Sequence, residues 1–329
     1  MAQRILEPGQ IETLAQRDIP RIILADRDRL FAARADRLRV LASASPISGY
    51  LQLLAALVDA QHAALARIAP ERLAGLQAAA ASQRRNGAAG AAGAGMPPLH
   101  AASLARDGYW RTLLRELCTH CAGHEAFPAQ AKAILEQLAA AQDAWIEAQA
   151  DALLDVPGAP PVEAGTAPFV MAALQVYWVA LGLAYGTGEL APMADAPGLC
   201  PLCGTAPVAS LVHAQAPHAS YRYLYCALCA CQWHYVRVQC SRCGAAGKDI
   251  AYPSLAGIDD PADTAKDAAV RAETCERCHG YRKILYLEKD PQVEPVADDL
   301  GTLALDLLLG EQGYERASQN PLLWQADGD

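Results

Sequence analysis

Hydrophobic positions recur every three or four residues over the first 190 residues, the period of an α-helix with one buried face. In the stretch 30–41, for example, leucine and phenylalanine fall on one side and charged residues on the other. No strand-like alternation interrupts this pattern, so residues 1–190 are predicted to form an all-helical domain. Helices are expected over residues 26–41, 49–68, 104–117, 128–154 and 166–184, with a further helix beginning at Pro70.

Two stretches of this domain depart from the amphipathic pattern. Residues 83–98 are mostly alanine and glycine and end in two prolines. They are predicted to be a flexible insertion with no core to bury. Residues 169–185 form an apolar run that is short for a membrane span of ~20 residues and contains Gln175 and Gly182. We therefore expect a buried helix there, and no insertion into a membrane.

The pattern changes after residues 186–198, which are rich in glycine and proline and predict a domain boundary. Aromatic-rich, alternating stretches at 220–225, 232–239 and 281–287 are typical of strands. An amphipathic helix is predicted over residues 295–313. The predicted domains are the helical domain at 1–190, a first ribbon region at 191–245, a second ribbon module at 240–290, and a C-terminal helix and tail at 291–329.

Eight of the eleven cysteines lie in the ribbon regions as four C-x-x-C pairs: Cys200/Cys203, Cys226/Cys229, Cys240/Cys243 and Cys275/Cys278. Each pair places two sulfurs at a tight turn, so two pairs complete a tetrahedral four-thiolate site. Gly204 and Gly244 directly follow two of the pairs, where such a turn often needs a positive φ. The eight cysteines are therefore predicted to bind two metal ions.

The spacing of the cysteines leaves three questions open. A four-cysteine site suits either zinc or a single iron ion. Pairing in sequence order is preferred to interleaved pairing, because neighbouring pairs then close one local ribbon. Disulfides or a thioredoxin-like redox pair are the alternatives to a metal, although disulfides are rare in cytosolic proteins.

Other candidate residues adjoin these motifs. Cys231 lies two residues after Cys229 and is expected to stand beside the first metal site, because the x-x spacing of Cys226 and Cys229 fits the turn better; replacement of Cys229 as a ligand is the alternative. His279 adjoins the fourth pair and could form a hydrogen bond near a sulfur, which would tune the metal. Trp233 and His234 belong either to the core of the ribbon or to a surface that faces a partner.

A further group, Cys118, Cys121 and His124, resembles a metal motif, but residues 113–121 have a helical pattern that includes both cysteines. Buried cysteines are common on helices, so we interpret these residues as part of the helix, with a reactive thiol or a third metal site as alternatives. His213 and His218 are interpreted as loop residues, because four cysteines already fill each metal site.

The charge and composition of the chain argue against several classes of function. The net charge of -9 and the pI near 5.4 argue against a nucleic-acid or anionic-membrane binder, and residues 199–290 carry a net charge of only about +1. The first residues contain no apolar secretory segment, which predicts a cytoplasmic protein. No Walker loop, H-E-x-x-H or Ser/His/Asp order occurs, and a closed four-thiolate site has no open position for substrate. The chain is therefore not expected to be an enzyme.

Several stretches of the chain carry a resemblance to a known family: residues 222–229, 233–243, 272–278, 283–291, 296–300, 305–306 and 313–321. The family that they resemble is that of the accessory proteins for formate dehydrogenase formation. The chain departs from the family pattern at Gln232, where glutamate is expected, and at Cys231, where a small hydroxyl residue is expected.

Pattern and resemblance together predict a mainly α N-terminal domain, small metal-bound β-ribbon modules of the rubredoxin or zinc-ribbon type, and a C-terminal helix. The resemblance implies a cytoplasmic, non-enzymatic helper that binds the immature molybdenum-containing catalytic subunit of respiratory formate dehydrogenase before its export. It also implies rubredoxin-like sites that hold iron, which favours iron over zinc for the eight cysteines.

Two other functions are compatible with the residues. A redox module would use iron in the four-thiolate sites or the extra thiols Cys118, Cys121 and Cys231. A nucleic-acid-binding zinc ribbon would need a basic face and salt-sensitive binding, and the nearly neutral ribbon regions make it the weaker alternative.

Overall fold

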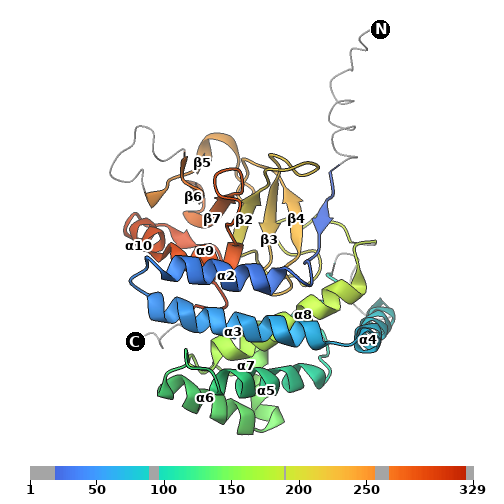
Figure 1. Ribbon diagram of the computed structural model, residues 1–329. Helices are drawn as coiled ribbons and strands as arrows, with labels where there is room; N and C mark the ends of the chain where they lie inside the picture. Colours follow the sequence, from blue (N-terminus) through green and yellow to red (C-terminus); the bar gives the residue numbers. More distant parts are fainter. Residues whose placement is uncertain (1–18, 89–95, 189, 256–266, 324–329) are drawn as a thin grey trace.

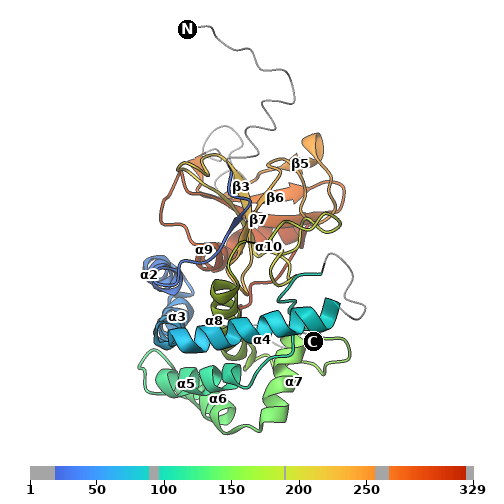
Figure 2. The same ribbon diagram turned by 90° about the vertical axis from the view of Figure 1, so that its right-hand side faces the viewer.

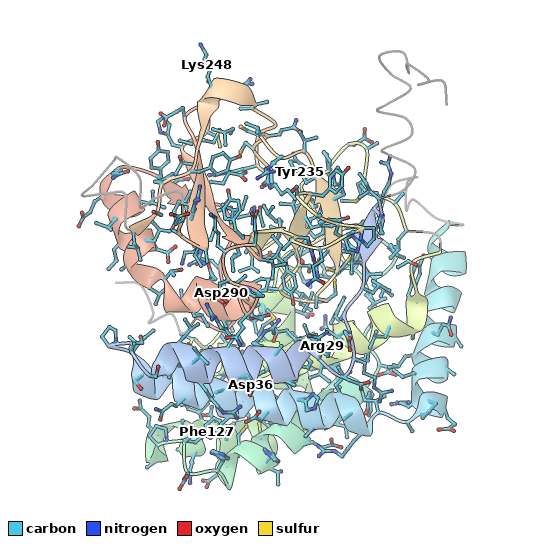
Figure 3. All side chains as sticks on the ribbon, turned by 45° about the horizontal axis from the view of Figure 1, so that its top comes forward. Arg29, Asp36, Phe127, Tyr235, Lys248 and Asp290 are labelled. Carbon is cyan, nitrogen blue, oxygen red and sulfur yellow. The ribbon has the colours of Figure 1, made fainter. Side chains whose placement is uncertain are left out.

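The computed structural model describes residues 19–88, 96–188, 190–255 and 267–323. Its strands gather in one region and most of its helices in another, with α2 (Leu30–Ala42) and α9 (Pro295–Gly301) between them (Figure 1). Figure 3 shows Lys248 at the outer end of the strand region and Phe127 among the helices on the opposite side. The predicted fold class, a helical N-terminal part followed by a strand-rich region with cysteine motifs, is confirmed.

The helical part is built around α8 (Ala167–Tyr185), in which every residue from Pro168 to Gly182 is buried. This helix is long and apolar enough to cross a membrane, but 83% of its apolar window lies inside the protein. Gln175 accepts a hydrogen bond from Gln61 (2.8 Å) and donates one to the carbonyl of Ala227 (2.7 Å), which satisfies its amide inside the core. The prediction of a buried helix is confirmed. The remaining helices of this part are α3 (Ser48–Arg67), α4 (Pro70–Ala88), α5 (Tyr109–Ala122), α6 (Ala129–Ala140) and α7 (Asp143–Leu153).

Two features of the helical part differ from the prediction. The single helix expected at 128–154 is interrupted, because Ala141 and Gln142 adopt extended backbone between α6 and α7. This break lets α6 pack on α5 while α7 packs on α8, at the end of the molecule farthest from the strands (Figure 2). Helix α4 continues to Ala88, so residues 83–88 of the predicted insertion are helical, whereas residues 89–95 lie outside the described part of the chain.

The two predicted ribbons share one sheet. Within the described residues eight strands pair in the order β1-β4-β3-β2-β7-β6-β5, with β8 beside β7. The parallel pairing of β2 with β7 joins the two cysteine-rich regions, and the short strand β1 from the N-terminal segment pairs with β4. The strands are β1 (Ile22–Ile23), β2 (Ala209–Val212), β3 (Arg222–Tyr225), β4 (Gln232–Tyr235), β5 (Ile250–Ala251), β6 (Val270–Cys275), β7 (Gly280–Tyr286) and β8 (Glu315–Arg316), with a 3-10 turn at Gly247–Asp249.

Buried ion pairs join α9 to the helix layer below the sheet. Arg34 of α2, whose side chain is fully buried, donates to Glu294 (2.9 Å) and to the hydroxyl of Tyr225 on β3 (3.0 Å). Glu294 also accepts from the backbone N–H groups that begin α9, so one carboxylate caps the helix and anchors it to α2. The single helix expected at 295–313 is interrupted at Thr302 and continues as α10 (Leu303–Glu311).

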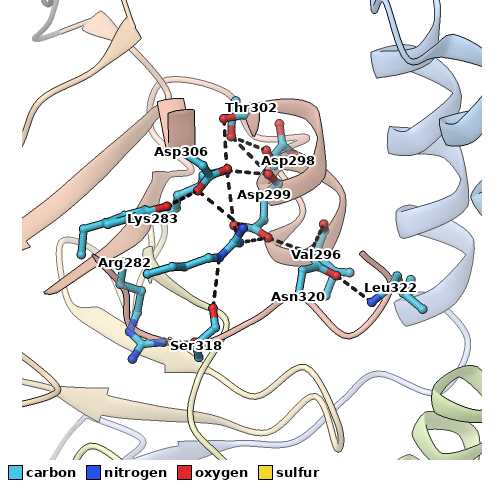
Figure 4. Close-up of polar contacts among 12 residues, drawn as sticks. Arg282, Lys283, Val296, Asp298, Asp299, Thr302, Asp306, Ser318, Asn320 and Leu322 are labelled. Atoms are coloured by element: carbon cyan, nitrogen blue, oxygen red, sulfur yellow. Dashed lines mark hydrogen bonds and ion pairs between the residues drawn. The ribbon is translucent and has the colours of Figure 1, made fainter. Parts of the chain in front are cut away.

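A second buried network fastens these C-terminal helices to β7 (Figure 4). Lys283 donates to Asp306 (2.7 Å) and to the carbonyl oxygens of Asp299 (2.6 Å) and Thr302 (3.1 Å). The carboxylate of Asp299 also accepts from Arg316 and from Asn320. Since Lys283 and Asp299 are fully buried, each charge depends on its partners inside the protein.

Replacing Lys283 with methionine is expected to lower the free energy of unfolding by about 3 kcal/mol, because Asp299 and Asp306 lose one of their two buried cations and keep only Arg316. The matched control is Lys289→Met, which breaks an exposed pair with Asp267 and should cost less than about 1 kcal/mol. Urea unfolding of the metal-loaded protein, followed by circular dichroism, compares the two. Equal losses in the two variants would contradict this account of the network.

Candidate metal centres

The first centre brings together the sulfurs of Cys200, Cys203, Cys226 and Cys229. The sulfur–sulfur distances are 3.5 Å for Cys200–Cys229 and 3.4 Å for Cys203–Cys226, and all four ligand atoms lie within 4.8 Å of one another. The second centre joins Cys240, Cys243, Cys275 and Cys278, with distances of 3.8 Å for Cys240–Cys278 and 3.7 Å for Cys243–Cys275. The cysteines therefore group in sequence order, and not in the interleaved arrangement.

Each C-x-x-C pair is shaped by a residue with positive φ directly after its second cysteine. These residues are Gly204 (φ 80°), Ala230 (φ 56°), Gly244 (φ 76°) and His279 (φ 50°). The left-handed conformation turns the chain back so that both sulfurs face the same point, and it confirms the role predicted for Gly204 and Gly244. Ala230 and His279 hold this conformation without the freedom of glycine, at a cost on the order of 1 kcal/mol each.

The sulfur geometry fits a four-coordinate metal and excludes disulfides. A tetrahedral ion with metal–sulfur bonds of ~2.3 Å separates its sulfurs by about 3.8 Å, close to the distances in both centres. A disulfide would require ~2.05 Å, and all eleven cysteines are free thiols. Backbone N–H groups also donate to the sulfurs, from Cys229 to Cys226 and from Arg242 to Cys240, each at 3.4 Å. The residues present thus fit zinc or iron, and the donor set does not distinguish the two.

The first centre is part of the main hydrophobic core. Its four cysteines are at most 2% exposed and belong to the same cluster as the helix residues. Burial raises the pKa of the Cys200, Cys203 and Cys229 thiols well above the usual value. Against the effect of burial, hydrogen bonds from the neighbouring thiols hold the pKa of Cys226 well below it. Four buried sulfurs that compete for protons in this way are energetically unfavourable unless a cation lies between them.

The second centre lies at the surface. Cys243 is exposed and Cys278 is partly exposed, and the centre belongs to a small separate cluster with Ala245 and Ile250. The space around Gly280, next to this centre, is tight: a Cβ added there would lie 3.3 Å from the Cys278 sulfur and 3.2 Å from the Arg242 side chain. The two centres therefore have the same ligands but very different access to solvent.

Cys231 is a fifth thiol at the first centre. It is buried, and hydrogen bonds with Cys200 and Cys229 lower the pKa of its thiol to about 6. The group of four sulfurs within 4.8 Å of one another does not include it. Cys231 thus stands beside the four sulfurs, the position favoured for it because the spacing of Cys226 and Cys229 fits the tight turn better.

Among the described residues, no side-chain hydrogen bond joins Trp233, His234 or His279 to a cysteine sulfur. Trp233 is fully buried and donates to the carbonyl of Pro197 (3.0 Å), so the structure corrects the idea that it faces a partner. The ring of His234 lies on the opposite face of β4, beside Tyr221 and Tyr223. The ring of His279 packs against Tyr314, with centroids 6.1 Å apart.

Cys118 and Cys121 are core residues of α5. Both are buried, whereas His120 and His124 are exposed, so the four side chains do not converge. Burial raises the pKa of both thiols to about 12. A reactive thiol needs a lowered pKa, so neither has the environment of a redox or nucleophilic cysteine.

In the folded, metal-loaded protein at pH 8, Cys118 and Cys121 are expected to stay unlabelled by iodoacetamide. With a pKa of about 12, only ~0.01% of each thiol is ionised at that pH, and burial also blocks the reagent. Mass spectrometry of tryptic peptides measures the labelling, and the urea-unfolded protein is the control in which both should react. Rapid labelling in the folded protein would overturn the assignment to the core.

Three sequence models of one family match the chain: "FdhE, N-terminal" at residues 19–195, "FdhE, central domain" at 199–237 and "FdhE, C-terminal domain" at 238–323. A Pseudomonas aeruginosa relative, "Protein FdhE homolog", is 41% identical over 335 residues that cover 98% of each chain. The Escherichia coli "Protein FdhE" is 35% identical over 334 residues that cover 100% of each chain.

A solved structure agrees with these matches. "The crystal structure of the FdhE protein from Pseudomonas aeruginosa" superposes with a TM-score of 0.75 at 38% identity. The similarity covers 92% of this chain and 99% of that one. The chain therefore belongs to the FdhE family, the accessory proteins for formate dehydrogenase formation.

Proposed function

We propose that the protein is a non-enzymatic, cytoplasmic helper that binds the immature molybdenum-containing catalytic subunit of formate dehydrogenase before export. The observation that carries the proposal is the pair of closed four-sulfur centres in a chain of this family. We further propose that the eight cysteines of these centres are the ligands of two metal ions. Iron is the favoured ion by family resemblance, and zinc is the alternative.

The geometry of the centres supports a helper more than a catalyst. In each centre four sulfurs converge on one point, so the ion would have no open position for water or substrate. The first centre belongs to the main core, and residues between its cysteines adjoin α8: Ala227 accepts a hydrogen bond from Gln175, and Leu202 packs at Gly182. The second centre, with Cys243 exposed, forms part of the outer surface, where a partner can reach it.

A redox function is the second candidate, favoured by the exposure of the second centre. An iron ion bound by four thiolates can exchange one electron, whereas zinc cannot. Cys243, which is exposed, and Cys278, which is partly exposed, give a short path from such an ion to a docked protein. A visible absorption band that bleaches on reduction would support this function, and a colourless protein with two zinc ions would exclude it.

The proposed function is tested in a strain that lacks this protein. Formate dehydrogenase activity is expected to be lost on deletion and restored by the wild-type chain. Cys118→Ala, which removes a core thiol outside both centres, is the matched control and should restore activity, whereas Cys243→Ser should restore it poorly.

Partner binding is tested separately. The metal-loaded protein, immobilised, should retain the immature catalytic subunit and not the exported, mature enzyme. Normal activity in the deletion strain would contradict the helper function itself. Lost activity without any retention of the catalytic subunit would contradict only the choice of partner.

A further inference from the structure

A pocket of about 580 Å³ opens beside the second centre. Its polar lining residues are Tyr235, Gln239, Ser241, Arg242, Cys243 and Arg282, and Asp195 is its one acidic lining residue. Its apolar lining includes Pro197, Leu199, Ala206 and Ala317. This volume falls in the range of small-molecule sites, ~300–1,000 Å³, and the mixed lining is typical of them.

Arg282 is a buried cation without a carboxylate partner. The residue is 5% exposed, and burial lowers the pKa of its guanidinium to about 10, so it is still charged at neutral pH. Its Nε donates to the Ser241 hydroxyl (3.1 Å) and its Nη1 to the Ser318 hydroxyl (2.8 Å). Both partners are neutral, and no ion pair of Arg282 occurs among the described residues.

The nearest carboxylate in the sheet is shared and makes no direct contact with Arg282. Glu273 lies directly opposite Arg282 across β6 and β7 and attracts its charge, but its Oε1 pairs with Arg222 at 2.7 Å and its buried Oε2 has no hydrogen-bond partner. Two buried arginines thus share one glutamate. Cys240 of the second centre attracts the guanidinium without a direct contact, so it offsets the charge but fills none of the remaining N–H groups.

The unfilled N–H groups belong to a residue that lines the pocket. Nη2 of Arg282 has no hydrogen-bond partner among the described residues. It does not belong to the fully buried polar atoms that lack a partner, so it keeps some exposed surface. Arg282 lines the pocket, so this is the space from which its Nη2 is reached. A guanidinium presented in this way matches the two oxygens of a carboxylate or phosphate, which it binds with paired hydrogen bonds.

We propose that this pocket binds a small organic oxyanion, a molecule with one carboxylate or phosphate group on an apolar body. The oxyanion pairs with Arg282 at the base of the pocket, and Arg242, which is exposed and now paired with Glu315 (3.3 Å), adds a second positive charge. The apolar body lies against Leu199 and Pro197. Occupancy would place an anion beside the Cys243 sulfur. The inference does not depend on the proposed function, because it rests on Arg282 and its surroundings alone.

The test uses the metal-loaded full chain and four probes: inorganic phosphate, acetate, phenyl phosphate and benzoate. Isothermal titration calorimetry is expected to show saturable binding with Kd on the order of 1 mM or tighter for at least one aromatic probe, and tighter than for the corresponding bare anion. The phosphate and carboxylate arms identify which group the pocket prefers. Absence of saturable binding for all four probes would overturn the proposal.

Three variants separate anion binding from a structural role of Arg282. Arg282→Gln should weaken binding at least about tenfold, and Arg282→Lys, which keeps the charge near the second centre but loses the paired hydrogen bonds, should weaken it by a similar factor. Arg237→Gln, an exposed arginine outside the pocket, is the control and should bind within about twofold of wild type. If Arg282→Lys, with two metal ions retained, binds as well as wild type, Arg282 serves only to balance the charge of the metal centre and the proposal fails.

Discussion

Replacing Cys226 with serine is expected to destroy the folded structure of the strand region and to destabilise the whole protein. The first centre lies inside the main core, where its four sulfurs pack with residues of α8 and the sheet. Structural metal sites contribute ~10–16 kcal/mol to folding in small domains, against a typical domain stability of 5–15 kcal/mol. Loss of one ligand of this centre should therefore cost on the order of 5 kcal/mol or more, and leave the variant aggregated or without a cooperative unfolding transition.

The matched variant is Cys243→Ser in the second centre. Cys243 is an exposed residue and its centre is separate from the main core, so the helices and most of the sheet should remain folded. We expect this variant to be soluble, to bind one metal ion per chain in place of two, and to unfold cooperatively. Metal analysis and thermal unfolding measure both variants. If Cys243→Ser were as damaging as Cys226→Ser, the proposed difference between the two centres would be wrong.

Chelation is expected to remove the two ions at very different rates. A chelator can approach the second centre directly through Cys243 and Cys278, whereas the first centre is reached only after the core opens. If local opening of the core costs ~3 kcal/mol, less than about 1% of the molecules are open at any moment. The first ion should therefore leave at least about a hundredfold more slowly than the second.

A zinc-loaded sample treated with EDTA or a chromogenic chelator should release metal in two phases of equal amplitude. In Cys243→Ser the fast phase should be absent while the slow phase keeps its rate, which assigns the phases to the centres. A single phase for the wild-type protein, or a fast phase that survives in Cys243→Ser, would contradict the assignment.

The cysteine motifs could be predicted because their geometry is local. A C-x-x-C turn, followed by a residue with positive φ, needs only five adjacent residues, and Gly204 and Gly244 marked two of the four turns. The helices were predictable for the same reason, since their hydrophobic period repeats every few residues. Ala230 and His279 hold the same conformation without glycine, so the local pattern did not identify them.

The sheet could not be predicted to the same extent, because its pairing connects distant segments. Strand β2 is buried on both faces, so its sequence does not alternate between apolar and polar residues. Strand β6 contains the charged residues Arg271 and Glu273, so its sequence is not typical of a strand. The parallel contact of β2 with β7 turns two expected ribbons into one sheet and leaves no local sign in the sequence. Arg282, the residue behind the inferred anion pocket, was likewise not recognisable, because its lack of a carboxylate partner depends on the fold.

The short pairing of Ile22–Ile23 with Trp233 and Gln232 has a consequence for biosynthesis. This edge strand emerges from the ribosome first but waits for a partner made about 200 residues later, and contacts of such long range form slowly. Until then the nascent chain contains the helices without the sheet that covers them, and not all four cysteines of the first centre have been synthesised. Metal capture at that centre is therefore a late event, after most of the polypeptide has been synthesised, and a fragment that begins after the helices would present β4 as an open edge.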